Sequence, residues 1–279
     1  MVHRLLSGAL SVERYEVAIA DLPPSLAGTR IVHLTDFHYD GLRLSDWLLS
    51  DAIAASNAAE PDLVLLTGDY VTDEPEPIED LVLHLKHLQA RAGVFASLGN
   101  HDLHFPRSRN VVTSAFERVG IRVLWNDVAT PLGAALPVVG LADLWSRGYR
   151  PEPVMSQLDP QRPRIVLSHN PDTAEGLQRW RADLILSGHT HGGQTFLIPG
   201  WGPIPTILQP IRRRLPKALA NVLPLLRECP SVVKHWEWAQ GWFSVGSNQL
   251  YVNRGLGTYL PGRVFCPPEI AIMTLVPAG

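Results

Sequence analysis

The segment DLILSGHTH, residues 183–191, runs from an apolar stretch through a glycine into two histidines. Four earlier segments share this design, because each is a short run of β-branched residues and leucine that ends in Gly, Asp, Asn or His. They are TRIVHLTDFH (29–38), DLVLLTGDY (62–70), GVFASLGNHD (93–102) and RIVLSHN (164–170). Continuous apolar runs of this length are typical of strands buried on both faces. The segments therefore predict buried strands that are each followed by polar side chains.

Helix-like segments alternate with these strands. Residues 44–60 contain a capping residue, Ser45, and apolar side chains at helical spacing, and residues 78–91 repeat leucine in the same way. Later segments look like strands with few helices between them, at 136–144, 240–255 and 269–276. These patterns predict an α/β fold with a mixed sheet, one of two sheets packed face to face.

The composition is that of an ordinary globular protein. Of 279 residues, 46% are hydrophobic and 18% are charged. Because no internal repeat or linker-like break interrupts the chain, we expect a single domain over residues 1–279. The formal net charge of −3 gives no reason to expect a nucleic-acid partner.

The sequence offers no clear membrane-crossing segment. The apolar run from Leu5 to Val12 is short for a span that needs about 20 apolar residues, and it lacks the cleavage site of a signal peptide. Cys229 and Cys266 form no CxxC pair, which favours reduced thiols and leaves a single bridge between them as the alternative. We therefore expect a cytoplasmic protein without a signal peptide or a transmembrane helix.

Residues 201–240 form an excursion from the predicted sheets. The stretch contains Trp201, Trp236 and Trp238, is rich in basic residues and is repeatedly broken by proline. In one interpretation it is a substrate-side lid or interfacial patch, in which Arg212–Arg214 meet anionic headgroups in peripheral contact with a membrane. In the other it packs its apolar residues on the domain.

Residue types that bind metals follow all five of the predicted strands. They are Asp36 and His38, then Asp69, then Asn100, His101 and Asp102, then His169, and finally His189 and His191. Ligands in open α/β sheets bind beyond the carboxyl ends of the strands, so we expect these side chains to converge. A lone histidine at a strand end is more often merely hydrogen-bonded, but five strand ends that obey one rule favour a metal site.

These residues divide into two ligand sets that share one carboxylate. One divalent ion would take Asp36, His38, Asp69 and His191, and the other would take Asp69, Asn100, His169 and His189. Nitrogen and oxygen ligands without a thiolate fit Mn, Fe, Zn or Ni, and they do not choose among these metals.

The blocks DFH, GDY, GNHD, SHNPD and GHTHGGQ resemble, in order, the five signature blocks of the calcineurin-like metallophosphoesterases. The segment YVNRGLGTYLPGRVFCPPEIAIMTL resembles the C-terminal block of a bacterial subgroup of predicted phosphodiesterases, which includes a UDP-diacylglucosamine pyrophosphatase. The resemblance extends from about Ile31 to the C-terminus. It implies a four-layer fold, a two-sheet β-sandwich flanked by helices, and the same assignment of the metal ligands.

The resemblance also implies a dimetal phosphoesterase. Two cations that share a water lower its pKa, so that a metal-bridging hydroxide attacks phosphorus in line. His101, beside a ligand but not itself a ligand, is expected to stabilise the developing charge or to protonate the leaving oxygen. Asp102 is expected either to orient His101 or to shape the turn.

Charge favours a phosphodiester over a phosphomonoester, and we expect cleavage of a phosphodiester or pyrophosphate bond. Two divalent ions, two aspartates and one hydroxide leave a single positive charge, which matches a diester, although Arg254 and Arg263 could approach and change this balance. The arginine that follows GDYV in protein serine/threonine phosphatases is missing, and Thr72 stands where purple acid phosphatases have a tyrosine ligand. We expect a small-molecule substrate, nucleotide-linked or lipid-linked. A phosphomonoesterase and a non-catalytic metal-bound binding module are the alternatives.

Overall fold

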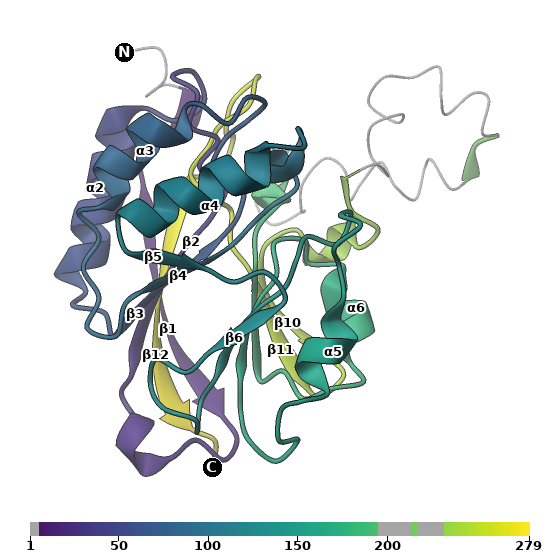
Figure 1. Cartoon of the computed structure of the whole chain (residues 1–279). Coiled ribbons are helices and arrows are strands. Elements are labelled where there is room, and N and C mark those ends of the chain that lie inside the picture. The colour runs from purple at the N-terminus through teal and green to yellow at the C-terminus, as the bar shows by residue number, and fades with distance from the viewer. Residues whose placement is uncertain (1–5, 195–213, 217–231) are drawn as a thin grey trace.

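The computed structural model describes residues 6–194, 214–216 and 232–279. Within them, two six-stranded sheets pack face to face, with helices on the outer side of each sheet (Figure 1). The predicted α/β fold, a two-sheet sandwich flanked by helices, is confirmed.

The first sheet carries most of the N-terminal half of the chain. Its strand order is β1-β12-β2-β3-β4-β5. The strands are β1 (Ser11–Ile19), β12 (Glu269–Pro277), β2 (Arg30–Leu34), β3 (Leu63–Thr67), β4 (Val94–Ser97) and β5 (Ile121–Val123). Strands β2 to β5 are parallel, whereas β12 pairs antiparallel with β2 and parallel with β1. The carboxyl ends of β2, β3 and β4 therefore lie at one edge.

The second sheet has the order β10-β11-β9-β8-β7-β6. The strands are β6 (Asp127–Ala129), β7 (Val138–Gly140), β8 (Ile165–Leu167), β9 (Leu184–Ser187), β10 (Gly241–Val245) and β11 (Asn248–Val252). Strands β7, β8, β9 and β11 run parallel, and β6 and β10 pair antiparallel at the two edges. The ends of β8 and β9 thus meet beside one another.

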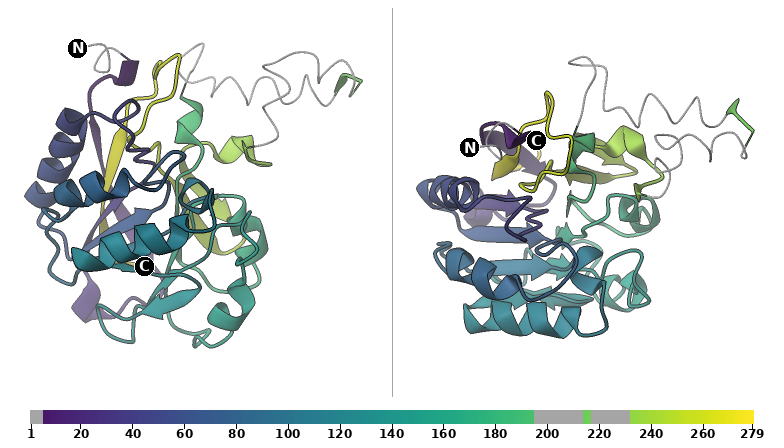
Figure 2. Two further views of the ribbon diagram at one scale, coloured as in Figure 1. Left: turned by 45° about the horizontal axis from the view of Figure 1, so that its top comes forward. Right: turned by 90° about the horizontal axis from the view of Figure 1, so that it is seen from above.

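Alternation along the buried strands creates the layers. In β3, Val64 and Leu66 belong to the cluster under the helices, while Leu63 and Leu65 face the other sheet. Helices α2 (Asp46–Ala58), α3 (Ile78–Leu85) and α4 (Ser108–Arg118) lie on the side of the first sheet, and α5 (Pro151–Met155) and α6 (Thr173–Leu177) on the side of the second. The view from above in Figure 2 separates these two halves.

Short 3₁₀ turns complete the described elements. They are η1 (Pro24–Leu26), η2 (His101–Leu103), η3 (His191–Gly193) and η4 (Trp236–Trp238). Two of them, η2 and η3, begin at histidines that follow strand ends, so the chain turns tightly where the polar side chains lie.

The predicted helices are both present, but one is shorter than expected. The Ser45 side chain accepts a hydrogen bond from the Leu48 amide and caps α2, as predicted. The helix predicted over 78–91 ends at Leu85. Beyond it, the Asn57 side chain donates to the His87 carbonyl and accepts from the Gln89 amide. These bonds satisfy backbone groups that a continued helix would have used.

Strand β1 and helix α4 were not predicted from the sequence. Strand β1 overlaps the short apolar run near the N-terminus, and its residues before Val17 are half-buried or exposed. Because such a strand has no continuous apolar run, periodicity alone gives a weak signal.

The predicted excursion at 201–240 falls largely outside the described residues. Its described end packs on the domain, because Val233, Trp236 and Ala239 form a small buried cluster. Among the described residues, no helix combines the length and apolarity that crossing a membrane requires. Cys266 is a buried free thiol, and Cys229 lies outside the described residues.

Candidate metal centre

The predicted ligands follow strands of both sheets. Asp36 and His38 follow β2, Asp69 follows β3 and Asn100 follows β4, all in the first sheet, while His169 follows β8 and His189 and His191 follow β9 in the second. All five strands end at the junction between the sheets. The structure therefore brings the predicted ligands together, and their binding of metal stays a prediction.

The first group consists of Asp36, His38 and His191, whose ligand atoms all lie within 4.8 Å of one another. The Nε2 atoms of His38 and His191 are 3.0 Å apart. Asp36 Oδ1 lies 3.4 Å from His191 Nε2. Two ring nitrogens and a carboxylate oxygen thus face one small volume.

The second group consists of Asp69, His169 and His189, again within 4.8 Å. Asp69 Oδ2 is 3.0 Å from His169 Nε2 and 3.6 Å from His38 Nε2, so this carboxylate stands between the groups. Asn100 Oδ1 is buried and has no hydrogen-bond partner among the described residues. An unpaired buried amide oxygen is costly unless a cation or water meets it, so this donor set fits a metal.

Each histidine of the two groups uses its other ring nitrogen for a hydrogen bond. His169 Nδ1 contacts the Thr67 carbonyl at 2.6 Å, and His191 Nδ1 contacts the Gly257 carbonyl at 3.2 Å. His38 Nδ1 contacts the Tyr259 hydroxyl at 3.0 Å, and His189 Nε2 contacts the Val232 carbonyl at 2.9 Å. Such bonds fix the tautomer and the ring orientation of metal-binding histidines.

The backbone at the candidate ligands is strained. Positive φ angles occur at Asp36 (52°), His38 (44°), Asp69 (55°), His189 (71°) and His191 (51°). This region costs a residue with a β-carbon about 1–3 kcal/mol, and such strain tends to gather at functional sites. These left-handed conformations break the alternation of a strand and let the side chains point toward the junction.

Close backbone contact explains the glycine before Asn100. A β-carbon at Gly99 would lie 2.2 Å from Asp69 Oδ1. Since real atoms cannot approach so closely, only glycine lets the β3 and β4 loops meet beneath the shared carboxylate.

Comparison with known proteins agrees with this geometry. Residues 29–193, more than half of the chain, match the calcineurin-like phosphoesterase family. The chain belongs to this family. It is 32% identical over 270 residues to phosphodiesterase YaeI of Escherichia coli, covering 92% of this chain and 86% of that relative. It is 30% identical to UDP-2,3-diacylglucosamine pyrophosphatase LpxG of Chlamydia trachomatis, covering 89% of this chain and 84% of the relative.

A solved structure supports the fold. The dimetal phosphatase of Danio rerio superposes with a TM-score of 0.51 at 11% sequence identity, over 84% of this chain and 90% of the other. The predicted family is confirmed, and the protein is a metal-dependent phosphoester hydrolase. Calcineurin-like phosphoesterases depend on a dinuclear metal centre, and the two ligand groups match that requirement.

Burial controls the protonation of the candidate ligands. Desolvation lowers the pKa of His38 and His189 to about 3, so both rings are neutral and able to bind a cation. Burial also disfavours charge on His169, but the adjacent Asp69 carboxylate overcomes this and raises the pKa of His169 to about 10. For Asp69, contact with His169 outweighs burial and holds the carboxyl pKa well below its usual value.

His101 lies beside these groups, as predicted. It lines a cavity of about 330 Å³ together with Asp69, Asn100 and His189. Its Nδ1 contacts the Thr72 carbonyl, which leaves Nε2 as the ring atom that can meet a substrate.

Asp102 is buried and binds backbone amides. Its carboxylate accepts hydrogen bonds from the amides of Asp69, Tyr70 and Gly99 at 2.8–2.9 Å. Two roles were expected for Asp102, orienting His101 or shaping the turn. The bonds to backbone amides match the shaping of the turn, and it is the Thr72 carbonyl that contacts the His101 ring. A part for Asp102 in catalysis stays a prediction.

Arg254 and Arg263 are both engaged away from the cavity. Arg254 forms ion pairs at 2.6 Å with Glu13 and Glu269. Arg263 is buried, and its Nη2 donates to the carbonyls of Arg254, Gly255 and Gly257. Neither side chain lines the cavity around His101.

The sequence did not reveal the partners of the ligand histidines. Thr67, Val232 and Gly257 act through backbone carbonyls, which carry no residue-specific signal. Tyr259 acts through its hydroxyl and lies 221 residues from His38. Its position in the C-terminal block YVNRGLGTYLPGR was the one available sign.

Proposed function

We propose that the protein hydrolyses a phosphodiester or pyrophosphate bond at a two-metal centre. The proposed ligands are Asp36, His38, Asp69, Asn100, His169, His189 and His191. The observation that carries the proposal is the position of Asp69, whose Oδ2 lies within 3.6 Å of His38 Nε2 and 3.0 Å of His169 Nε2. One carboxylate can therefore bridge two cations.

The metals would supply positive charge to the phosphoryl oxygens and lower the pKa of a bound water. The chain's own residues would hold and orient the substrate. His101 Nε2 would stabilise the negative charge that develops on the phosphoryl oxygens or give a proton to the leaving oxygen, while the Thr72 carbonyl fixes the ring. The amide bonds of Asp102 would keep Asp69 and Asn100 in place.

A phosphodiester is favoured over a phosphomonoester by charge. Arg254 and Arg263, the two arginines of the C-terminal block, bind glutamates and carbonyls instead of facing the candidate metal centre. With two aspartates and a hydroxide around two divalent ions, about one positive charge remains, which suits a singly charged diester. The relatives named phosphodiesterase and pyrophosphatase support this choice.

The identity of the substrate and of the metals extends the proposal. We propose Mn, Fe, Zn or Ni, because the donor set is nitrogen and oxygen without sulfur. LpxG is named for a substrate that is both nucleotide-linked and lipid-linked, and we propose a substrate of that general class for this chain.

Peripheral membrane contact through residues 201–240 remains part of the proposal. Sedimentation with anionic liposomes tests this contact. The wild type is compared with a triple variant in which Arg212, Arg213 and Arg214 are changed to alanine. Binding by the wild type that falls in the triple variant would support the contact, and equal binding by both would exclude it.

The proposed activity is tested with metal-stripped protein reloaded with Mn²⁺. We expect faster hydrolysis of bis(4-nitrophenyl) phosphate than of 4-nitrophenyl phosphate. His101→Ala should lower the diester rate about 10²–10⁴-fold, the range for loss of a general acid or base. His87→Ala, at an exposed histidine, is the matched control and should retain the rate.

Two other results would replace the proposal. Faster hydrolysis of the monoester would identify a phosphomonoesterase and overturn the charge argument. No hydrolysis of any diester or pyrophosphate, with two metals bound by elemental analysis, would favour the non-catalytic binding module.

A further inference from the structure

A second, larger cavity adjoins the candidate metal centre. It has a volume of about 590 Å³, within the range of roughly 300–1,000 Å³ common for small-molecule sites. Asn100 and Trp145 line both this cavity and the one around His101. A substrate with its phosphoryl group at the metals could therefore extend directly into the second cavity.

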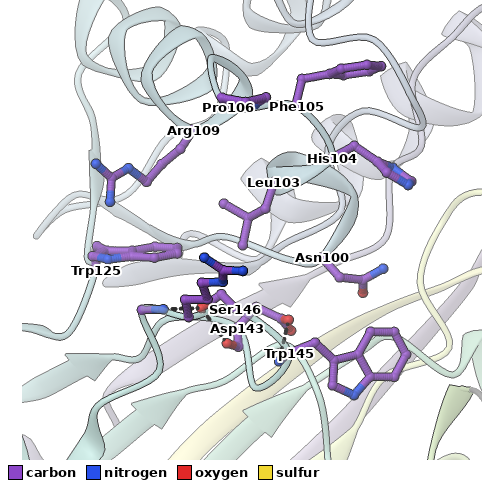
Figure 3. Close-up of a pocket in the computed structure, with 12 residues that line it drawn as sticks. Asn100, Leu103, His104, Phe105, Pro106, Arg109, Trp125, Asp143, Trp145 and Ser146 are labelled. Atoms are coloured by element: carbon purple, nitrogen blue, oxygen red, sulfur yellow. Dashed lines mark hydrogen bonds between the residues drawn. The ribbon is translucent and has the colours of Figure 1, made fainter.

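The far end of the cavity is aromatic and cationic. Figure 3 shows Arg109 beside Trp125 at this end, and the guanidinium carbon lies 5.2 Å from the Trp125 ring centre. Within the part of the chain that the structure describes, neither Arg109 nor the other lining arginine, Arg147, has an ion-pair partner. Tryptophan faces and guanidinium planes are the surfaces on which flat bases stack.

The near end of the cavity contains a buried carboxylate. Asp143 is 1% exposed, and its Oδ1 accepts a hydrogen bond from the Trp145 amide at 2.9 Å. Its Oδ2 has no partner among the described residues, although the side chain lines the cavity. Because a buried unpaired carboxylate oxygen is costly, a ligand that donates O–H or N–H groups would complete the site.

Trp145 lies between these ends and the metal ligands. Trp145 is 50% exposed, and its ring lies roughly perpendicular to the His189 ring, with the two ring centres 4.8 Å apart. In Figure 3 it lies near Asn100 and Asp143, on the side away from Trp125. It therefore offers an exposed aromatic surface where the two cavities join.

We propose that this cavity binds the nucleoside part of the substrate, in a molecule whose 5′-phosphoryl group is joined to a second group by a diester or pyrophosphate bond. The proposal rests on the proposed function for the place of the phosphoryl group. Asp143 accepts from sugar hydroxyls or base N–H groups, and Trp125 with Arg109 stacks on the base. An acyl chain fits this cavity poorly, because it would leave the buried Asp143 carboxylate oxygen without a hydrogen-bond donor.

Binding to the Mn²⁺-loaded full-length protein tests the proposal by titration calorimetry. The probes are inorganic phosphate, ribose 5-phosphate, glycerol 3-phosphate, uridine monophosphate and adenosine monophosphate. We expect at least one of the two nucleoside monophosphates to bind tenfold or more tightly than each of the three probes that lack a base. Stacking of one base contributes about 5- to 150-fold in affinity. Equal affinity for all probes, or tightest binding of glycerol 3-phosphate, would overturn the proposal.

Variants locate the selectivity within the cavity. Trp125→Ala, Arg109→Ala and Asp143→Asn should each lower the ratio of nucleotide affinity to phosphate affinity by about fivefold or more. Arg118→Ala is the control, since Arg118 lies on the same helix as Arg109 but pairs with Glu79 outside the cavity. A ratio that all three cavity variants retain would refute the assignment. If Asp143→Asn lowers phosphate affinity as much as nucleotide affinity, Asp143 belongs to the metal centre instead. Arg109→Ala, at an exposed position, would then decide whether the cavity binds the nucleoside.

Hydrolysis separates this inference from the proposed function. Cleavage of bis(4-nitrophenyl) phosphate without selectivity for nucleoside monophosphates would refute the nucleoside cavity alone. Selectivity that the cavity variants abolish, without cleavage of any diester, would refute the hydrolytic function and support the cavity.

Discussion

At the scale of single residues, the candidate ligands are held by atoms that would not themselves touch a metal. The ring of His38 contacts the Tyr259 hydroxyl, and the ring of His191 contacts the Gly257 carbonyl. Arg263 donates to that same carbonyl at 2.6 Å. Because a metal binds only a correctly oriented ring nitrogen, we expect the metal affinity of the proposed site to depend on these outer contacts.

Replacement of Tyr259 by phenylalanine tests this dependence. The change removes the hydroxyl that contacts His38 Nδ1 and keeps the ring, so we expect Mn²⁺ affinity to fall about 10- to 100-fold with little change in folding. Competition with a fluorescent chelator measures the affinity. Tyr39→Phe, which removes a hydroxyl that donates to Asp46 at the surface, is the control. Equal affinity in all three proteins would show that the hydroxyl does not position His38.

At the scale of elements, the N-terminal strand is secured through an ion-pair network. Arg254, in the loop after β11, pairs with Glu13 on β1 and with Glu269 on β12. The Tyr251 hydroxyl donates to Glu269, whose side chain is only 4% exposed. These contacts connect β1 and β12, two neighbouring strands of the first sheet, to the end of a strand in the second.

Loss of Arg254 should therefore destabilise the fold. Arg254→Ala leaves the buried Glu269 without its cationic partner, and breaking a buried pair in this way costs about 3–5 kcal/mol. Urea unfolding followed by circular dichroism gives the free energy of unfolding. Arg122→Ala removes an exposed pair with Asp127 and should change that free energy by less than about 1 kcal/mol. A similar small effect for both variants would refute a structural role for the network.

At the scale of the whole molecule, the candidate centre connects the two sheets. The first sheet supplies Asp36, His38, Asp69 and Asn100, and the second supplies the other three ligands. Asp36 also accepts a hydrogen bond at 3.0 Å from the amide of His189, across the junction. Cations bound here would neutralise the buried carboxylates of the first sheet. The same cations would also bind histidines of the second sheet and so link the two sheets.

Metal binding should therefore raise the unfolding temperature. At a concentration 100 times its Kd, a ligand specific to the native state adds about 2.7 kcal/mol, which corresponds to roughly 5 °C or more for a chain of this size. Differential scanning calorimetry with Mn²⁺ and with a chelator measures the shift. Asp69→Asn should lose most of it, because Asp69 contacts both ligand groups. An unchanged unfolding temperature on metal addition would contradict a structural link through the centre.

Local sequence determined the buried strands, the Ser45 cap and the residues that follow each strand end. These features follow from short-range patterns, since apolar runs, capping residues and glycines act within a few residues. The α/β class and the convergence of Asp36, Asp69 and Asn100 followed because parallel strands place their carboxyl ends at one edge. The packing of the two sheets decided that His189 joins them from the second sheet.

Tertiary structure alone decided the features that depend on distant contacts. Helix α3 ends early because Asn57, about 30 residues away in the chain, takes the hydrogen bonds beyond it. His169 is oriented by the Thr67 carbonyl across 102 residues, and Asp143 faces a cavity that is also lined by residues between 103 and 109, from the end of η2 to the start of α4. Backbone carbonyls and cavity walls have no residue-specific signature, so only the packed chain reveals which of them meet.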